Sequence, residues 1–160
     1  MTKQYDDIRD LLASNKLMGL SGQGATDEDI SFAERKMGVN FPISFRSFLK
    51  EHGWGYFGSL ELISGLGTDI PKEWESGTNL LQVVDDERLG PSHFPHDIIP
   101  FCQNGAGDWY ALDCSRSDRK EATVVFVAHE NVAGNGFNSE FCAMSFADWI
   151  YEKLSGNALA

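Results

Sequence analysis

The sequence predicts an α+β domain in which a mostly antiparallel sheet is flanked by N-terminal helices and a C-terminal helix. Apolar residues recur at helical spacing in the first third of the chain, and β-branched or alternating runs fill the second half. An amphipathic segment with an N-cap residue follows these runs near the C-terminal end of the chain. Helices first, antiparallel strands next and a helix last is an order typical of α+β folds. The length of 160 residues suits one core, so we expect a single domain over residues 1–160.

The first helix is expected over residues 5–13, followed by a connector. The apolar positions of this helix fall at helical spacing. They are Tyr5, Ile8, Leu11 and Leu12. Residues 18–25 contain three glycines, which predict a flexible connector without regular structure.

The second helix is indicated at both of its ends. Thr26 is a good N-cap, and Asp29 stands three residues later, as in a capping box. Gly38 is placed to end the helix. The inward face is formed by Ile30, Ala33 and Met37. Pro42 suits the first turn of a third helix, which carries Phe45, Phe48 and Leu49 inward and is broken at residues 52–55.

The middle of the chain is expected to hold one strand and one helix. Residues 56–63 predict a strand with Phe57, Leu60 and Leu62 as apolar contributors. Residues 73–88 predict a further helix that Gly77 interrupts. Its inward positions are Trp74, Leu80, Leu81 and Val84.

The C-terminal half contains three expected strands and the closing helix. Residues 98–102 are a short apolar run, residues 109–114 alternate, and residues 123–127 are β-branched enough for a buried strand. In the alternating strand, one side carries Tyr110, Leu112 and Cys114 and the other carries Trp109, Ala111 and Asp113. Ser145 caps the last helix, and Gly156 is placed to end it.

The formal net charge of −11 is unevenly distributed. Residues 1–50 hold seven acidic and seven basic residues. Residues 51–115 hold eleven acidic residues against two basic ones, a net of −9, and residues 116–160 have a net of −2. This argues against a nucleic acid partner, because phosphate binding needs a basic surface. An acidic face would steer a basic protein partner, but the same charge can also serve solubility alone.

The composition predicts a cytoplasmic protein that does not associate with membranes. No apolar run approaches the roughly 20 residues that span a bilayer. The polar, acidic start lacks the apolar core of a signal peptide. The three cysteines are odd in number and lack metal-binding spacing, which favours reduced and mostly buried thiols.

The sequence contains no recognisable motif for catalysis or metal binding. No serine or cysteine lies in a GxSxG pattern, and the glycines of residues 19–24 lack the Lys-Ser/Thr ending of a phosphate-binding loop. His93 and His96 are three residues apart, but Phe94 and Pro95 favour an ordinary loop over a rigid metal site. We therefore expect no enzymatic activity, no cofactor and no metal.

Two segments are candidates for binding a partner. Residues 105–108 form a turn that leads into Trp109. The turn is either a plain hairpin, in which glycine supplies positive φ and Asp108 bonds to the backbone, or a site. Trp54 and Tyr56 flank a glycine and are either core residues or exposed anchors, since Trp and Tyr are enriched at interface hot spots.

Two stretches of the chain follow a known family pattern in order and spacing. The first contains Ile30, Ala33-Glu34, Met37-Gly38-Val39, Phe41-Pro42, Phe45, Phe48-Leu49 and His52-Gly53-Trp54-Gly55. The second contains Ile99-Pro100-Phe101, the segment Gly105 to Asp113, Val124 to Val127, His129-Glu130 and Ser145 to Ile150. Over residues 26–154 the chain resembles the SUKH superfamily of Smi/Knr-type domains. It departs from the pattern at His52 and Trp54, where Asn and a second Gly are commoner, which affects the shape of that turn.

The resemblance implies an α+β domain with a sheet flanked by helices and no catalytic centre. Many bacterial members resemble immunity proteins that bind and neutralise a cognate toxin, often a nuclease, whereas fungal members are regulators with several partners. We therefore expect an antitoxin-like protein whose acidic face, drawn from residues 51–115, covers a basic toxin surface. A regulatory or scaffolding module with a non-toxin partner is the alternative, and a small-molecule binder using residues 108–110 is a third.

The residues expected to contact the partner come from the acidic segment and the two aromatic turns. They are Trp54, Tyr56, Asp85, Asp86, Glu87, Asp108 and Trp109.

Overall fold

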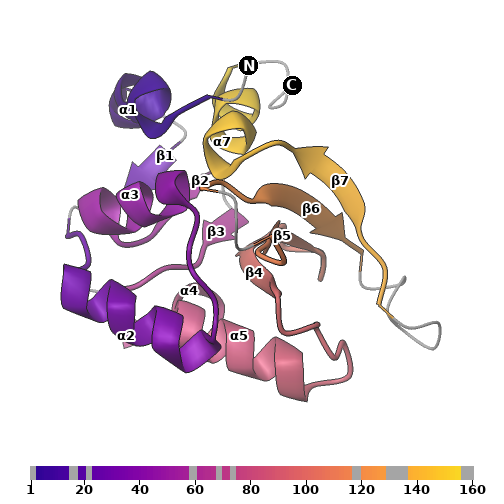
Figure 1. The fold of residues 1–160 in the computed structure, drawn as a ribbon. Coiled ribbons are helices and arrows are strands. Elements are labelled where there is room, and N and C mark those ends of the chain that lie inside the picture. The colour runs from indigo at the N-terminus through magenta and orange to yellow at the C-terminus, as the bar shows by residue number, and fades with distance from the viewer. Residues whose placement is uncertain are drawn as a thin grey trace.

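One antiparallel sheet of seven strands organises the computed structural model of the chain (Figure 1). The strands are β1 Met18–Leu20, β2 Gly55–Phe57, β3 Glu61–Ile63, β4 Ile98–Gln103, β5 Trp109–Asp113, β6 Thr123–Val127 and β7 Glu140–Ala143. Each strand pairs with the next one along the chain, so β1 and β7 form the edges. The structure describes residues 3–14, 18–20, 23–57, 61–67, 70–72, 75–116, 120–128 and 137–155.

The helices lie before, between and after the strands, which confirms the predicted α+β class. They are α1 Tyr5–Ser14, α2 Asp27–Met37, α3 Ile43–His52, α4 Glu75–Thr78, α5 Leu80–Leu89 and α7 Phe146–Leu154. α1 packs against α3 and α7, so elements from the two ends of the chain lie together. α2 and α5 lie side by side below them in Figure 1.

The capping signals read from the sequence are confirmed in the structure. The hydroxyl of Thr26 accepts the N–H of Asp29 at 3.1 Å, and the Asp29 carboxylate accepts the N–H of Thr26 at 3.3 Å. Gly38 ends α2 with φ of 75°, a conformation that glycine adopts without strain. The Ser145 hydroxyl accepts the N–H of Asp148 at 3.0 Å and starts α7. These local hydrogen bonds satisfy helix-end N–H groups that have no partner within the helix.

The connector expected over residues 18–25 is wrong at its start, where β1 forms. The glycine-rich sequence of this segment gives no local strand signal, and pairing with β2 creates the strand through Met18↔Phe57 and Leu20↔Gly55. The single strand expected over residues 56–63 is also wrong in part. The structure has two short antiparallel strands, β2 and β3, because the chain reverses between them.

The helix expected over residues 73–88 is divided into α4 and α5. Asn79 separates them and caps α5, since its side-chain oxygen accepts the N–H groups of Leu81 and Gln82. Leu80 and Val84 point inward as expected, whereas Trp74 lies outside the described residues. β7 was not predicted from the sequence; it lies at the edge of the sheet, where Phe141 is exposed.

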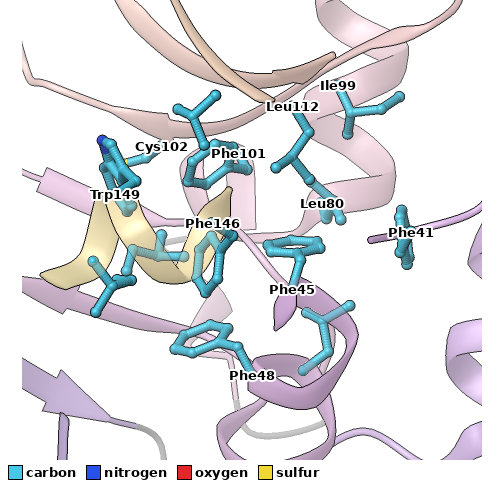
Figure 2. Packing of buried hydrophobic residues seen from close by; sticks show 14 of the residues in the cluster. Phe41, Phe45, Phe48, Leu80, Ile99, Phe101, Cys102, Leu112, Phe146 and Trp149 are labelled. Atoms are coloured by element: carbon cyan, nitrogen blue, oxygen red, sulfur yellow. The ribbon is translucent and has the colours of Figure 1, made fainter. Parts of the chain in front are cut away.

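The main core lies on the face of the sheet that α3 and α7 cover (Figure 2). The ring of Phe45 lies 5.1 Å from that of Phe146 and 5.8 Å from that of Phe101, measured between centroids. Trp149 packs edge-on against Phe101 at 4.9 Å. These rings come from α3, β4 and α7, so one aromatic cluster ties three parts of the chain together.

A second, smaller core covers the opposite face. It consists of Val83, Phe94, Ile98, Trp109, Ala111, Val125 and Val127. The alternation predicted for β5 is confirmed for its apolar residues: Leu112 belongs to the main core, with Tyr110 packed against it, whereas Trp109 and Ala111 belong to the second. Because both faces are covered, β5 is a central strand that is buried on its two sides.

The start of α3 is held by the segment that precedes β6. The N–H of Ile43 donates to the carbonyl of Lys120 at 2.9 Å. The N–H and the hydroxyl of Ser44 both donate to Glu121 Oε1, at 3.2 and 2.9 Å. Burial raises the pKa of Glu121, and the two hydrogen bonds from Ser44 oppose that effect without cancelling it. The ionised carboxylate is therefore less favourable in the folded protein than in the unfolded chain.

We predict that Phe45→Ala lowers the free energy of unfolding by about 3–5 kcal/mol, because it opens a cavity beside the rings of Phe41, Phe101 and Phe146. The matched helical control is Phe32→Ala. Phe32 lies on α2 with 52% of its side chain exposed, and its removal should change stability by about 0.5 kcal/mol or less. Urea titration followed by circular dichroism measures both. Equal losses would contradict the assignment of the core.

We predict that Glu121→Gln becomes more stabilising as the pH rises. The folded-state pKa of Glu121 lies above its unfolded value, so the wild type loses stability as the pH rises through that window, and glutamine does not. Urea unfolding at about pH 4 and about pH 7 should show the variant gaining relative to wild type at the higher pH. A pH-independent difference would show that burial of the charge is unimportant.

Candidate protein-binding surface

The exposed side of α5 carries two carboxylates and one leucine. Gln82, Asp85, Asp86 and Leu89 follow the i, i+3, i+4, i+7 spacing of one helix face, and all four are exposed. Leu89 is 83% exposed, the highest value among the large apolar side chains that the structure describes. We refer to these four residues as the acidic α5 face.

The opposite side of α5 fixes the helix to the fold. Leu80, Val83 and Val84 are buried. One guanidinium nitrogen of Arg88 donates to the carbonyl of Met37 at 2.9 Å and to that of His96 at 2.7 Å. The first of these bonds ties α5 to the C-terminal end of α2. The acidic α5 face is therefore presented from a rigid element.

Within the part of the chain that the structure describes, the carboxylates of the acidic α5 face form no direct ion pair. Elsewhere, acidic side chains pair with cations: Arg9 with Asp6 and Glu51, Arg46 with Glu34, Lys50 with Asp27, and Lys153 with Glu61. Among the described residues, neither Asp85 nor Asp86 forms an ion pair. The one base within their helix, Arg88, donates hydrogen bonds to backbone carbonyls, and its guanidinium also feels the charge of Asp85, which opposes the lowering of the Arg88 pKa by burial. Part of the acid excess of residues 51–115 is therefore exposed at this surface as negative charge.

Glu87 joins the acidic helix to the sheet. The indole N–H of Trp109 donates to Glu87 Oε1 at 3.1 Å, and Trp109 is only 6% exposed. Trp109 is therefore a residue of the second core. It can affect partner binding only indirectly, through its hydrogen bond to Glu87 of α5. Three of the predicted contact residues, Asp85, Asp86 and Glu87, thus lie on one helix that Trp109 braces.

The turn between β4 and β5 is closed by its own side chains. Asn104 Oδ1 accepts the N–H groups of Ala106 and Asp108, and its amide donates to Asp108 Oδ2 at 3.1 Å. Gly105 and Gly107 have φ of 84° and 93°, which only glycine adopts readily. The positive φ glycines of the hairpin considered from the sequence are present, whereas the side chain that bonds to the turn backbone in these hydrogen bonds is Asn104 rather than Asp108. Asp108 stabilises the turn that leads directly into Trp109.

Trp54 and Tyr56 lie in another part of the sheet. Trp54 is 5% exposed, directly before β2, whereas Tyr56 is 38% exposed on that strand. β2 and β5 are separated by two strands in the sheet order. The structure therefore does not place this pair beside Trp109 in the sheet.

Leu89 was not predicted from the sequence as an exposed apolar residue. The signal was present, since Leu89 follows Gln82 by seven residues and lies opposite the buried Leu80 and Val84 on the helix. His129-Glu130, part of the family pattern, lies outside the described residues. Within the described ranges, no group of three His, Cys, Asp or Glu side chains could hold a metal ion. In those ranges no helix has the length and apolar character to cross a membrane.

Two comparisons with known proteins bear on this surface. The family model described as SMI1/KNR4 family (SUKH-1) matches residues 24–152, which include all of the acidic α5 face and all of the second core. No curated protein matches the chain.

We predict that Trp109 and Glu87 are energetically coupled. In a double-mutant cycle of Trp109→Phe and Glu87→Ala, the coupling free energy should be about 1 kcal/mol, the net value of one hydrogen bond. Urea unfolding of the four proteins measures it. The control cycle pairs Trp109→Phe with Asp86→Ala, which should be additive within about 0.5 kcal/mol. Additivity in both cycles would show that Glu87 does not brace the helix.

Proposed function

The chain belongs to the SMI1/KNR4 (SUKH-1) family, and from this premise we propose that it is an immunity-like protein that neutralises a cognate toxin by binding it. The contact surface is the acidic α5 face, and the partner presents a basic surface to it. The observation that carries this proposal is the exposed pair of carboxylates of Asp85 and Asp86, which form no direct ion pair among the described residues, on a braced helix. Free surface charges of one sign speed the approach of an oppositely charged protein.

A nuclease is the toxin class that best suits an acidic surface. Nucleases bind phosphate groups, so their active-site surfaces carry lysine and arginine. Carboxylates on a folded protein can occupy the same positions as phosphates and exclude the substrate. Leu89 adds an apolar contact at the end of the same face, where exposure of 83% leaves much area to be removed from water.

The size of a stable interface sets a further requirement. A specific complex buries on the order of 800 Å² per partner, from about 20–30 residues a side. The four residues of the acidic α5 face are therefore the centre of a larger contact. Its remainder has to come from neighbouring surfaces, which include the β4–β5 turn beside Trp109 and the exposed side of α2 next to α5.

We predict that the charge-reversed variant Asp85→Lys/Asp86→Lys binds the toxin at least about tenfold more weakly, because four units of local charge change at the contact. The probe is the polypeptide encoded beside this chain, produced as an inactive variant, and surface plasmon resonance measures association and dissociation. Wild-type association should slow markedly between about 20 and 150 mM salt, and that salt dependence should flatten in the variant.

The matched control is Asp10→Lys/Glu152→Lys. It makes the same change in net charge at two exposed helical positions, on α1 and α7. Its affinity should remain within about threefold of wild type. Equal weakening by both double variants would attribute binding to net charge alone. A failure of the wild type to bind the neighbouring polypeptide, or to protect cells that express it, would refute the toxin assignment.

A further inference from the structure

A pocket opens between the N-terminal ends of α2 and α5, next to the acidic α5 face. Its volume is about 260 Å³, several times the roughly 30 Å³ that one water molecule occupies in the liquid. The lining residues come from α2, from the segment after β3, and from the start of α5. They are Asp29, Phe32, Leu66, Gly67, Ile70, Asn79 and Leu81. α2 and α5 run side by side here, which is visible in Figure 1.

The walls of the pocket are mostly apolar, and one of them is aromatic. Leu66 is buried, and Ile70 and Leu81 are half-buried. Phe32 is 52% exposed at the rim, although it lies on a helix with a well-defined buried face. An exposed phenylalanine beside an apolar hollow offers a ring face to an entering side chain.

The polar groups of the pocket favour a cation. Among the lining residues that the structure describes, Asp29 is the one that carries a charge, and none is a lysine, arginine or histidine. Its carboxylate accepts the N–H of Thr26 at 3.3 Å, which leaves most of its acceptor capacity. Among the described residues, no cation forms an ion pair with Asp29. The carboxylate is therefore placed at the mouth of an apolar pocket with its charge uncompensated.

The helix dipoles do not reverse this preference. The N-termini of α2 and α5 together present about one positive elementary charge. The first turn of α2 carries Asp27, Glu28 and Asp29, of which Asp27 pairs with Lys50. Asp85 follows Leu81 by one turn of α5 and adds a further negative charge on that side. The local balance remains negative.

We propose that this pocket receives an arginine side chain of the partner, an inference that rests on the proposed function and names how the basic partner is recognised. The methylene stem of arginine packs on Leu66, Ile70 and Leu81. Its planar guanidinium stacks on the ring of Phe32 and donates two hydrogen bonds to the carboxylate of Asp29. An aliphatic side chain would bury the Asp29 charge without a partner, and an acidic one would be repelled.

The test uses the isolated chain and N-acetyl-arginine methylamide as the probe. Two-dimensional NMR of the ¹⁵N- and ¹³C-labelled protein follows the signals of Phe32, Ile70 and Leu81 during titration. We expect saturable shifts at these residues in the millimolar range. N-acetyl-leucine methylamide should shift them about tenfold more weakly, since it lacks a group to pair with Asp29. Stronger binding of the leucine probe would overturn the proposal.

Two variants remove the two parts of the recognition separately. Asp29→Asn retains a side-chain oxygen for the N–H of Thr26 and should weaken arginine binding about three- to tenfold. Phe32→Ala leaves the core intact and should weaken arginine binding about threefold. Asp10→Asn, which removes an exposed charge on α1, should change the affinity for the arginine probe by less than about twofold. Equal effects of the two aspartate variants would show general attraction to an acidic protein and would refute the pocket.

The outcome is distinguishable from a failure of the proposed function. Arginine binding at the pocket without a complex with the neighbouring polypeptide would refute the toxin assignment and leave the pocket standing. A complex whose affinity is unchanged by Phe32→Ala and Asp29→Asn would refute the pocket alone.

Discussion

The ring of Phe101 is the contact on which the rest of the structure depends. It lies on β4 in the middle of the chain, and Phe45 of α3, Phe146 of α7 and Trp149 of α7 all pack against it at 4.9 to 5.8 Å. The helices that cover the main face of the sheet therefore converge on one residue from opposite ends of the sequence. Such contacts form only after long loops are closed, so the helical layer and the sheet stabilise each other.

The same constraint explains why α5 can present charge to solvent. Leu80 and Val84 enter the main core and Val83 enters the second, while Arg88 ties the helix to the end of α2. Trp109 adds a hydrogen bond to Glu87 from the sheet side. With its inner side held in three ways, α5 tolerates two adjacent unpaired carboxylates whose mutual repulsion would otherwise favour fraying. In the N-terminal helices, several acids instead pair with cations, among them Asp6, Asp27 and Glu34.

The parts of the fold that local chemistry controls were predictable. The capping box of Thr26 and Asp29, the left-handed glycine at position 38 and the alternation of β5 all follow from residue type and spacing, and the structure has them. β1 and the hairpin of β2 and β3 were not predictable, because their residues become strands only through pairing with one another. The candidate site residues were predictable only in part. Asp85 and Asp86 were identified from their charge, whereas the burial of Trp54 and Trp109 depends on the residues that pack over them.

The sequence by itself determined the family, the fold class and the location of the acid excess in residues 51–115, since these depend on composition, order and spacing. Only the tertiary structure decided which of those acids remain unpaired, because ion pairing requires a cation within reach in space rather than along the chain. It also decided that Leu89 and Phe32 are exposed on two helices that lie side by side. The pocket between those helices exists because α2 and α5, about fifty residues apart in sequence, meet at their N-terminal ends.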